Sequence, residues 1–301
     1  MIDILIIGGG PAGLTAALYA ARAGKAVSFC ESESLGGQIT QSPQVDNYPG
    51  LPAVSGLALA DALAAQAMDA GAVLEFTHVN GLTRNADGTF TAETDDGTLD
   101  AKAVIFAGGA KARPLGVENE ADFVGRGVSY CALCDGAFFR GKDVAVVGGG
   151  STAFSDALYL AKICRSVTLI HRRDGFRAEL PLIEAAKTTE NLQILTPYTV
   201  SALQGSHALE ALVLKNAQTG ENKILPVSAV FAAIGHMPNC SALGDLADLD
   251  ESGYAVADEH CRTKTPGLFV AGDCRTKDIR QLTTATADGT SAAVAACEYL
   301  G

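Results

Sequence analysis

Short runs of apolar residues with few polar interruptions recur along the chain. Such runs are typical of strands in parallel sheets, which are covered on both faces and therefore lack the alternation of a half-exposed strand. We predict buried parallel strands at residues 2–7, 26–30, 103–106, 143–147, 167–170 and 268–271.

Stretches rich in alanine predict the helices that connect these strands. Helices are expected at 14–23, stopped by Gly24, at 54–70, closed by Gly71, at about 151–164, and at 281–300. Segments 72–101 and 192–233 instead contain short strand-like pieces separated by turns, which predicts antiparallel meanders.

The first apolar run leads into a glycine motif. Gly8, Gly10 and Gly13 have the G-x-G-x-x-G spacing, a predicted helix follows, and the next strand ends in Glu31. This order indicates a dinucleotide-binding unit, because the glycines permit a tight turn, close approach to a pyrophosphate and close helix packing. The acid accepts hydrogen bonds from ribose hydroxyls. The alternative is a glycine-rich turn in an ordinary βαβ unit.

A second unit of the same kind begins 140 residues later, at Gly148. Its second strand ends in the basic segment His171-Arg172-Arg173, followed by Arg177. Guanidinium groups bind phosphate through charge-assisted, often bidentate hydrogen bonds, so this unit suits the 2′-phosphate of NADPH, whereas the first suits FAD. The alternative for the arginines is a solvated basic face.

Two short segments join the units. Residues 113–116 lead into the second unit, and residues 234–239 lead back to the first. We predict an α/β fold of two Rossmann-like, three-layer ββα dinucleotide-binding domains, the second inserted into the first. The expected FAD-binding domain comprises 1–112 and 244–301, and the expected NADPH-binding domain is 113–243.

Composition and charge narrow the function classes. The chain has 301 residues, 48% hydrophobic and 19% charged, and its net charge of −12 makes nucleic acid and anionic membranes poor partners. Residues 113–243 hold 12 basic and 12 acidic residues, so the remainder carries the whole net charge. Neither a signal peptide nor a spanning apolar run is recognisable, which predicts a cytoplasmic protein without membrane association.

Only two of the eight cysteines are close in sequence. Cys131 and Cys134 form a C-x-x-C motif, which can close a small disulfide ring or hold half of a metal site. A structural zinc site needs four ligands, and no second C-x-x-C or C-x-x-H partner exists. Between two nucleotide-binding units, the pair is best interpreted as a redox centre, with no metal.

Along nearly its full length the chain resembles the low-molecular-weight thioredoxin reductases. The motifs that carry the resemblance are Gly8-Gly9-Gly10-Pro11-Ala12-Gly13, Gly36-Gly37-Gln38, Asn47-Tyr48-Pro49-Gly50, Cys131-Ala132-Leu133-Cys134-Asp135-Gly136, His171-Arg172-Arg173, Ile234-Gly235-His236, Gly272-Asp273 and Arg280-Gln281. The resemblance implies a homodimeric flavoprotein that uses NADPH, FAD and the cysteine pair to reduce thioredoxin or a thioredoxin-like protein.

The resemblance also implies a set of site residues. For FAD they are Gly8, Gly10, Pro11, Ala12, Gly13, Glu31, Gly36, Gly37, Gln38, Asn47, Gly108, Asp273, Arg280, Gln281 and Leu282. For NADPH they are Gly150, Ser151, Thr152, His171, Arg172, Arg173, Arg177, Ile234 and Gly235.

In the redox centre, the resemblance implies that Cys134 faces the flavin and that Cys131 attacks the partner disulfide. Asp135 is the candidate general acid/base, with a turn residue before Gly136 as its alternative. Phe138 and Phe139 are expected to pack in the core near the motif, with a contact to the flavin or the partner as the alternative. The nearby basic residues Arg126, Arg140 and Lys142 are expected to dock an acidic partner or to face solvent.

Two departures from the family pattern concern the electron donor and partner. Ser151 stands where the family has an acid or Asn, although serine is a good helix N-cap. Leu133 replaces the usual Thr between the cysteines. The competing function is therefore a related flavoprotein disulfide reductase or dithiol oxidase with another donor or substrate. Because NADPH and the disulfide must both reach one flavin, we expect rotation of 113–243 about the crossovers.

Overall fold

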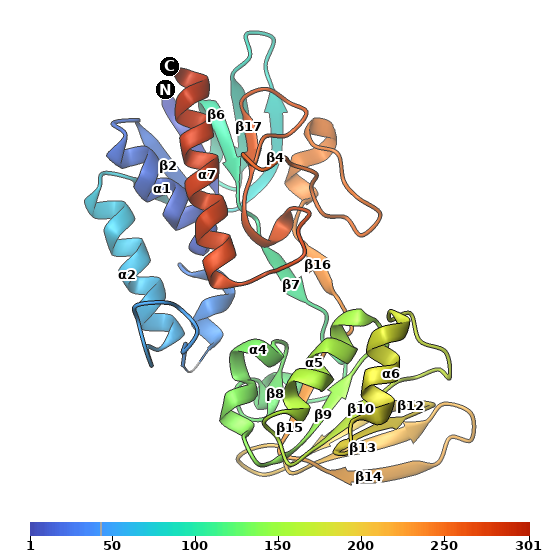
Figure 1. Cartoon of the computed structure of the whole chain (residues 1–301). Coiled ribbons are helices and arrows are strands. Elements are labelled where there is room, and N and C mark those ends of the chain that lie inside the picture. The colour runs from blue at the N-terminus through green and yellow to red at the C-terminus, as the bar shows by residue number, and fades with distance from the viewer. Residues whose placement is uncertain (43) are drawn as a thin grey trace. The chain divides into compact units, whose positions relative to one another are not determined.

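The computed structural model describes residues 1–42 and 44–301, which fold into two compact units (Figure 1). Unit 1 comprises Met1–Lys111 and Met237–Gly301, and unit 2 comprises Ala112–His236. The predicted fold class is confirmed, since both units are α/β with parallel sheets. The second unit ends at His236, earlier than the expected boundary at 243/244, and Cys240 and Leu243 are buried in the core of unit 1.

The main sheet of unit 1 has the strand order β3-β2-β1-β6-β5-β4, and β17 pairs with β6 beside this path. Strands β3, β2, β1, β6 and β17 run parallel, whereas β6, β5 and β4 form an antiparallel meander. The bounds are β1 Ile2–Ile7, β2 Val27–Cys30, β3 Val73–Glu75, β4 Val79–Arg84, β5 Phe90–Thr94, β6 Gly97–Phe106 and β17 Leu268–Val270. The strand predicted at 103–106 is thus the end of a longer strand that also belongs to the meander.

Both faces of this sheet are buried, as the unbroken apolar runs predict. Ile4 and Ile6 lie in one apolar cluster with the helices, whereas Leu5 and Ile7 lie in the cluster on the opposite face. The helical layer consists of α1 Pro11–Arg22, α2 Gly56–Asp69 and α7 Leu282–Leu300. Alanine is abundant in these helices because small side chains let α1 and α7 pack closely against each other.

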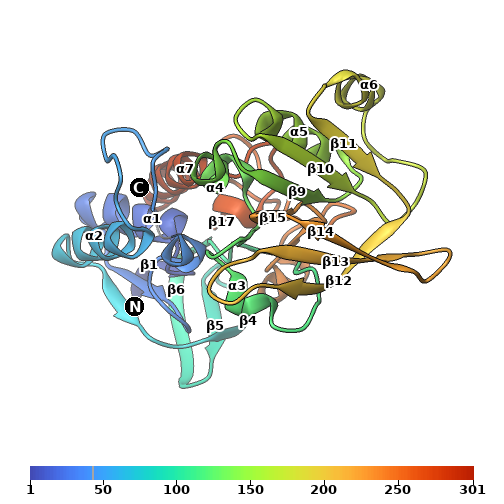
Figure 2. The same cartoon turned by 90° about the horizontal axis from the view of Figure 1, so that it is seen from below.

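Unit 2 repeats this architecture in three layers (Figure 2). Its parallel sheet has the order β11-β10-β9-β15-β8, helices α5 and α6 cover one face, and the separate antiparallel sheet β12-β13-β14 covers the other. The bounds are β8 Val128–Ser129, β9 Asp143–Val147, α5 Ser151–Ala161, β10 Ser166–Ile170, α6 Leu180–Thr188, β11 Leu192–Leu195, β12 Tyr198–Gln204, β13 Ala211–Asn216, β14 Asn222–Pro226 and β15 Ala229–Ala232.

The prediction that all of 192–233 forms a second meander is wrong. Only β12, β13 and β14 form an antiparallel meander, because β11 and β15 at its two ends join the parallel sheet beside β10 and β9. Turn signals reveal where strands begin and end, but the partner of each strand is decided by long-range packing.

The internal repeat extends to strand register. Ile4 pairs with Val27 in unit 1, and Val144 pairs with Val167 in unit 2, so both partners are displaced by 140 residues. Each glycine loop therefore begins at the same point of its sheet, after the carboxyl end of the central strand. In open parallel sheets this edge is where ligands bind.

Short elements complete the fold. The two crossovers pair with each other in the small sheet of β7 Ala110–Ala112 and β16 His236–Pro238. The remaining turns are η1 Gly37–Gln41, α3 Glu120–Phe123, α4 Ala132–Asp135, η2 Gly136–Phe139, η3 Ser241–Leu246 and η4 Gly272–Cys274. Among the described residues, no helix has both the length and the apolar character needed to cross a membrane.

Candidate functional site

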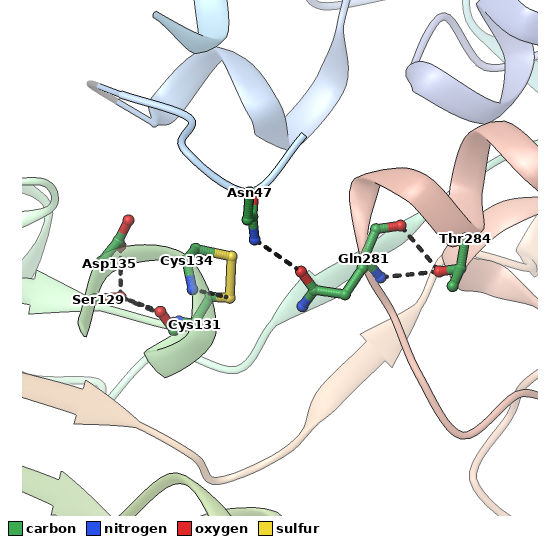
Figure 3. The surroundings of a disulfide bond; sticks show 7 residues. All are labelled: Asn47, Ser129, Cys131, Cys134, Asp135, Gln281 and Thr284. Carbon is green, nitrogen blue, oxygen red and sulfur yellow. Dashed lines mark hydrogen bonds between the residues drawn. A yellow bond between two sulfur atoms is a disulfide. The ribbon is translucent and has the colours of Figure 1, made fainter. Parts of the chain in front are cut away.

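The two motif cysteines are joined by a disulfide on the short helix α4 of unit 2 (Figure 3). Their Cα atoms are 5.3 Å apart, and Cys131 is the N-cap of α4, its Sγ accepting a hydrogen bond of 3.2 Å from the backbone N–H of Cys134. A Cβ on Gly136 would lie 2.8 Å from a side-chain carbon of Leu160, so the redox turn packs tightly on helix α5.

A half-buried carboxylate, that of Asp135, follows the disulfide directly. The Asp135 Oδ2 atom accepts a 2.7 Å hydrogen bond from the Ser129 hydroxyl, while its Oδ1 atom is buried without a partner among the described residues. Burial raises the pKa of Asp135, opposed by the hydrogen bond from Ser129. A carboxyl group with a raised pKa and an unpaired oxygen, on the residue that follows Cys134, is the candidate for exchanging protons with the cysteine pair.

Ser129 is a site residue that sequence reasoning missed. Its hydroxyl also accepts a hydrogen bond of 3.1 Å from the backbone N–H of Cys131, so it links the residue that opens the redox turn to Asp135. No motif marks Ser129, because its role depends on strand β8 reaching the same edge of the sheet as α4.

The prediction that both phenylalanines pack in the core is wrong for one of them. Phe139 packs edge-on against Phe231, with ring centroids 5.8 Å apart, but the Phe138 side chain is 38% exposed. Leu133, between the cysteines, is 50% exposed. Leu133 lies on α4 between the two cysteines, and Phe138 lies on the next turn, η2. Of the two rings on η2, only that of Phe139 is directed inward.

The first glycine loop has the shape expected of a dinucleotide cradle. Gly8 has φ +113°, and a Cβ there would lie 2.3 Å from the backbone oxygen of Ala107. Gly10 faces open space and caps α1 without a side-chain hydrogen bond. Glu31 accepts a 2.9 Å hydrogen bond from the backbone N–H of Gly9, so the carboxylate predicted to meet a ribose also holds the glycine loop in place.

Other candidates for FAD lie around the same loop. The N–H of Gly36 donates to the oxygen of Gly9 at 2.8 Å, and a Cβ on Gly272 would lie 2.8 Å from the Cβ of Ala12. The Asp273 Oδ1 atom is buried with no hydrogen-bond partner in the described part of the chain, and burial raises the pKa of this carboxyl. An orphaned buried oxygen beside the cradle fits a hydroxyl-bearing ligand, since native proteins rarely leave such atoms unpaired.

Three distant segments of unit 1 meet at the start of α7. Asn47 donates to the side-chain oxygen of Gln281 at 3.2 Å, and Gln281 caps α7 through its contacts with Thr284 (Figure 3). Arg280 donates to the backbone oxygen of Asp273 at 3.2 Å, and its guanidinium lies 3.8 Å from the centre of the Tyr254 ring. These side chains are separated in sequence but form one connected group.

The remaining FAD candidates occupy the same unit without comparable links to that group. The Gln38 side chain bonds to the backbone oxygen of Ala110, and Leu282 is the first residue of α7. Gly37 has φ +57°, and a Cβ on Gly108 would lie 2.5 Å from the backbone oxygen of Asn239. Pro11 begins α1, and Gly13 is the site where a Cβ would meet the oxygen of Gly8 at 1.9 Å.

The second glycine loop resembles the first, but Ala153 stands at the position of Gly13 and a histidine replaces the acid. A Cβ on Gly148 would lie 2.4 Å from the oxygen of Ala233, and Gly150 faces open space as the N-cap of α5. His171 takes the position of the acid, with its ring over Gly149. Burial lowers the pKa of His171, and the nearby arginines act in the same direction.

The arginines beside this loop are available to an anion. The backbone N–H of Arg177 donates to the oxygen of Gly149 at 2.8 Å, which places the basic segment against the loop. Arg172, Arg173 and Arg177 are exposed, and within residues 1–42 and 44–301 no carboxylate forms an ion pair with them. Unpaired guanidinium groups next to a glycine loop fit a phosphate-bearing cofactor.

The expectation that Ser151 caps α5 is wrong. Gly150 is the N-cap and Ser151 is the first helical residue, whose hydroxyl accepts a 3.2 Å hydrogen bond from the N–H of Glu179. The serine therefore ties the start of α5 to the start of α6. Thr152, the next residue, is exposed. At the return crossover, the backbone oxygen of Gly235, which follows Ile234, accepts a 2.9 Å hydrogen bond from the backbone N–H of Arg113.

Comparison with known proteins agrees with this geometry. The family described as pyridine nucleotide-disulphide oxidoreductase matches residues 2–289. The thioredoxin reductase of Helicobacter pylori is 41% identical to this chain, covering 100% of it and 99% of that protein. The bifunctional thioredoxin reductase/thioredoxin of Mycobacterium leprae is also 41% identical, over 99% of this chain and 66% of that longer protein. The crystal structure of the thioredoxin reductase from Streptococcus pyogenes matches with a TM-score of 0.95 at 39% identity, covering 100% of this chain and 98% of that one.

Proposed function

Because the chain belongs to the pyridine nucleotide-disulphide oxidoreductase family, with thioredoxin reductases as full-length relatives, we propose that it reduces the disulfide of thioredoxin or a thioredoxin-like protein with electrons from NADPH. The observation that carries the proposal is the Cys131–Cys134 disulfide on a partly exposed turn of the unit that also holds the arginine-flanked glycine loop. The bifunctional relative, whose name includes thioredoxin, supports the choice of substrate.

The two glycine loops divide the cofactors between the units. FAD is assigned to unit 1, where Gly8, Gly10 and the orphaned oxygen of Asp273 would hold it. NADPH is assigned to unit 2, where Gly150 and Arg173, with its neighbouring arginines, would hold the phosphates. When bound, the two cofactors supply a pair of electrons to the disulfide by hydride transfer between nicotinamide and flavin.

The protein's own residues complete the reaction. The two electrons open the Cys131–Cys134 bond, and Asp135 takes up or returns the accompanying protons. The Cys131 thiolate then attacks the partner disulfide, which forms a mixed disulfide and releases one partner thiolate. The Cys134 thiolate attacks that mixed disulfide, releases the second partner thiolate and restores the ring. The exposed side chains of Leu133, Phe138 and Arg140 border this reaction site and would contact an apolar and acidic partner surface.

We assign the enzyme to the cytoplasm as a homodimer. The six cysteines outside the redox pair are free thiols in the structure, five of them buried, which suits a reducing compartment. Size-exclusion chromatography with light scattering tests the dimer.

The decisive assay is NADPH-dependent reduction of a chromogenic disulfide reagent, with and without added thioredoxin. Cys131→Ser should abolish thioredoxin reduction while NADPH still bleaches the flavin, because only the exchange step is lost. Cys297→Ser, which replaces a free thiol in unit 1, is the matched control and should retain activity. Slow or absent bleaching by NADPH in the wild-type enzyme would favour the competing function with another donor.

A further inference from the structure

Glu120 is a buried carboxylate outside the redox turn. It is the first residue of α3 and only 7% exposed, and within the described chain no cation pairs with it. Its Oε1 atom accepts hydrogen bonds from the Leu115 N–H and the Tyr130 hydroxyl, each 2.8 Å long. Its Oε2 atom accepts a 2.9 Å bond from the Gly116 N–H. Three donors from two segments thus compensate for the burial of this charge.

Tyr130 connects Glu120 to the redox turn. It precedes Cys131 directly, and its ring packs in the same apolar cluster as Leu115. Burial, together with the hydrogen bond to Glu120, raises the pKa of Tyr130, so the hydroxyl remains a donor throughout the working pH range. On the other side of Tyr130, Ser129 is bound to Asp135. The backbone that enters the disulfide is therefore held by two carboxylates, the buried Glu120 and the half-buried Asp135.

The other end of this network is the crossover into unit 2. Leu115 and Gly116 follow β7, and the preceding Arg113 donates to the oxygen of Gly235 at the return crossover. Glu120 therefore lies between the segment where the chain enters the unit and the residue before the reactive cysteine. All of these contacts are internal to unit 2.

We propose that Glu120 is a positioning residue that couples the crossover at Leu115–Gly116 to the redox state of the Cys131–Cys134 pair through Tyr130. Breaking the sulfur–sulfur bond frees Cys131 to move, and the Tyr130 hydroxyl transmits the movement to the carboxylate that holds both crossover amides. Coupling is reciprocal, so the conformation of the crossover must equally affect the thiols. The inference rests on the proposed function only in that the disulfide opens in each cycle.

Amide hydrogen exchange on the FAD-loaded protein tests the coupling. Exchange at Leu115 and Gly116 is measured with the disulfide intact and after reduction by dithiothreitol. In the wild type the two states should differ by about tenfold, as expected when one hydrogen bond to a buried carboxylate is weakened. In Tyr130→Phe the difference should disappear, because the ring remains but the link is cut. A purely structural role would instead raise exchange equally in both states.

Two further variants sharpen the test. Tyr198→Phe is the matched control: Tyr198 packs in the same cluster, but no hydrogen bond of its hydroxyl is found in the described structure, so it should keep the wild-type difference. Glu120→Gln should lose the difference at Gly116 but keep it at Leu115, since its amide nitrogen cannot accept the bond from Gly116 while its amide oxygen still accepts from Leu115 and Tyr130. The proposal is overturned if the wild type shows no redox-dependent difference, or if Tyr130→Phe retains it. Because dithiothreitol replaces NADPH, failure of the proposed function would not affect this result.

Discussion

Replacing Asp288 should destabilise unit 1 more than removing any surface ion pair. Asp288 lies on α7, and its Oδ2 atom accepts 2.9 Å hydrogen bonds from the Gly272 N–H and from Arg275, together with a bond from Lys277. Its Oδ1 atom accepts a further 3.1 Å bond from Arg275. The side chains of Asp288, Arg275 and Lys277 are only 10%, 15% and 8% exposed, so Asp288→Ala leaves two cations buried without their counter-ion.

The loss of unfolding free energy in Asp288→Ala follows from the burial of these three side chains. Removing one partner of a buried ion pair costs about 3–5 kcal/mol, because the remaining charge is uncompensated. At about 2–4 °C per kcal/mol for a unit of this size, the melting temperature should fall by roughly 6–20 °C. The exposed pair Arg262–Glu298 is the control, and Glu298→Ala should cost no more than about 1 kcal/mol.

The stabilisation of unit 1 by Asp288 should decrease in acid. Burial raises the pKa of Asp288, but the hydrogen bonds from Arg275 and Lys277 outweigh it, and the net pKa is lowered. The stabilisation is therefore complete above the ordinary pKa of an aspartate and is lost as pH falls through the lowered value. Urea unfolding of wild type and Asp288→Ala, at equal FAD concentration, should show a gap at pH 7 that narrows in acid. A loss below about 1 kcal/mol at pH 7 would refute the reasoning.

Three further predictions concern unit 2. Burial raises the pKa of Asp156 to about 6. The folded protein therefore favours the protonated carboxyl, and stability is highest below pH 3.8 and falls as pH rises through 6. Asp156→Asn should unfold at higher urea than wild type at pH 8 but not at pH 4. Arg173→Ala should raise the KM for NADPH about tenfold or more and leave that for NADH nearly unchanged, whereas Arg165→Ala, whose partner is Asp143, should alter neither. Asp135→Asn should slow thioredoxin reduction about a hundredfold or more while NADPH-driven flavin bleaching persists, and unchanged turnover would exclude proton transfer by this group.

Elements that depend on neighbouring residues were predictable from the sequence, whereas pairing between distant segments was not. The strands at 2–7 and 143–147 were predicted correctly because an apolar run is a local signal. Helix α6 was missed, since Arg177 and the polar residues near it obscure the periodicity that begins at Leu180. Strand partners within 192–233 were assigned wrongly, because pairing depends on residues far away along the chain.

The sequence by itself determined the parts of this protein that depend on neighbours in the chain. Two glycine motifs, the basic segment after the second, and two cysteines three positions apart have chemical meaning wherever the rest of the fold lies. Local backbone geometry links spacing to shape in each of them, and the position of the cysteine pair between two nucleotide-binding units, with no second ligand pair, indicates a redox centre.

Tertiary structure alone decided how those parts are supported. The bonds from Ser129 to Asp135, from Tyr130 to Glu120 and from Asn47 to Gln281 join residues on different elements, and the last pair is 234 positions apart. A buried polar group must find a partner inside the fold, but any of many polar residues can serve, so composition and spacing do not specify which one. The choice is made when strands and helices pack and bring particular donors within reach.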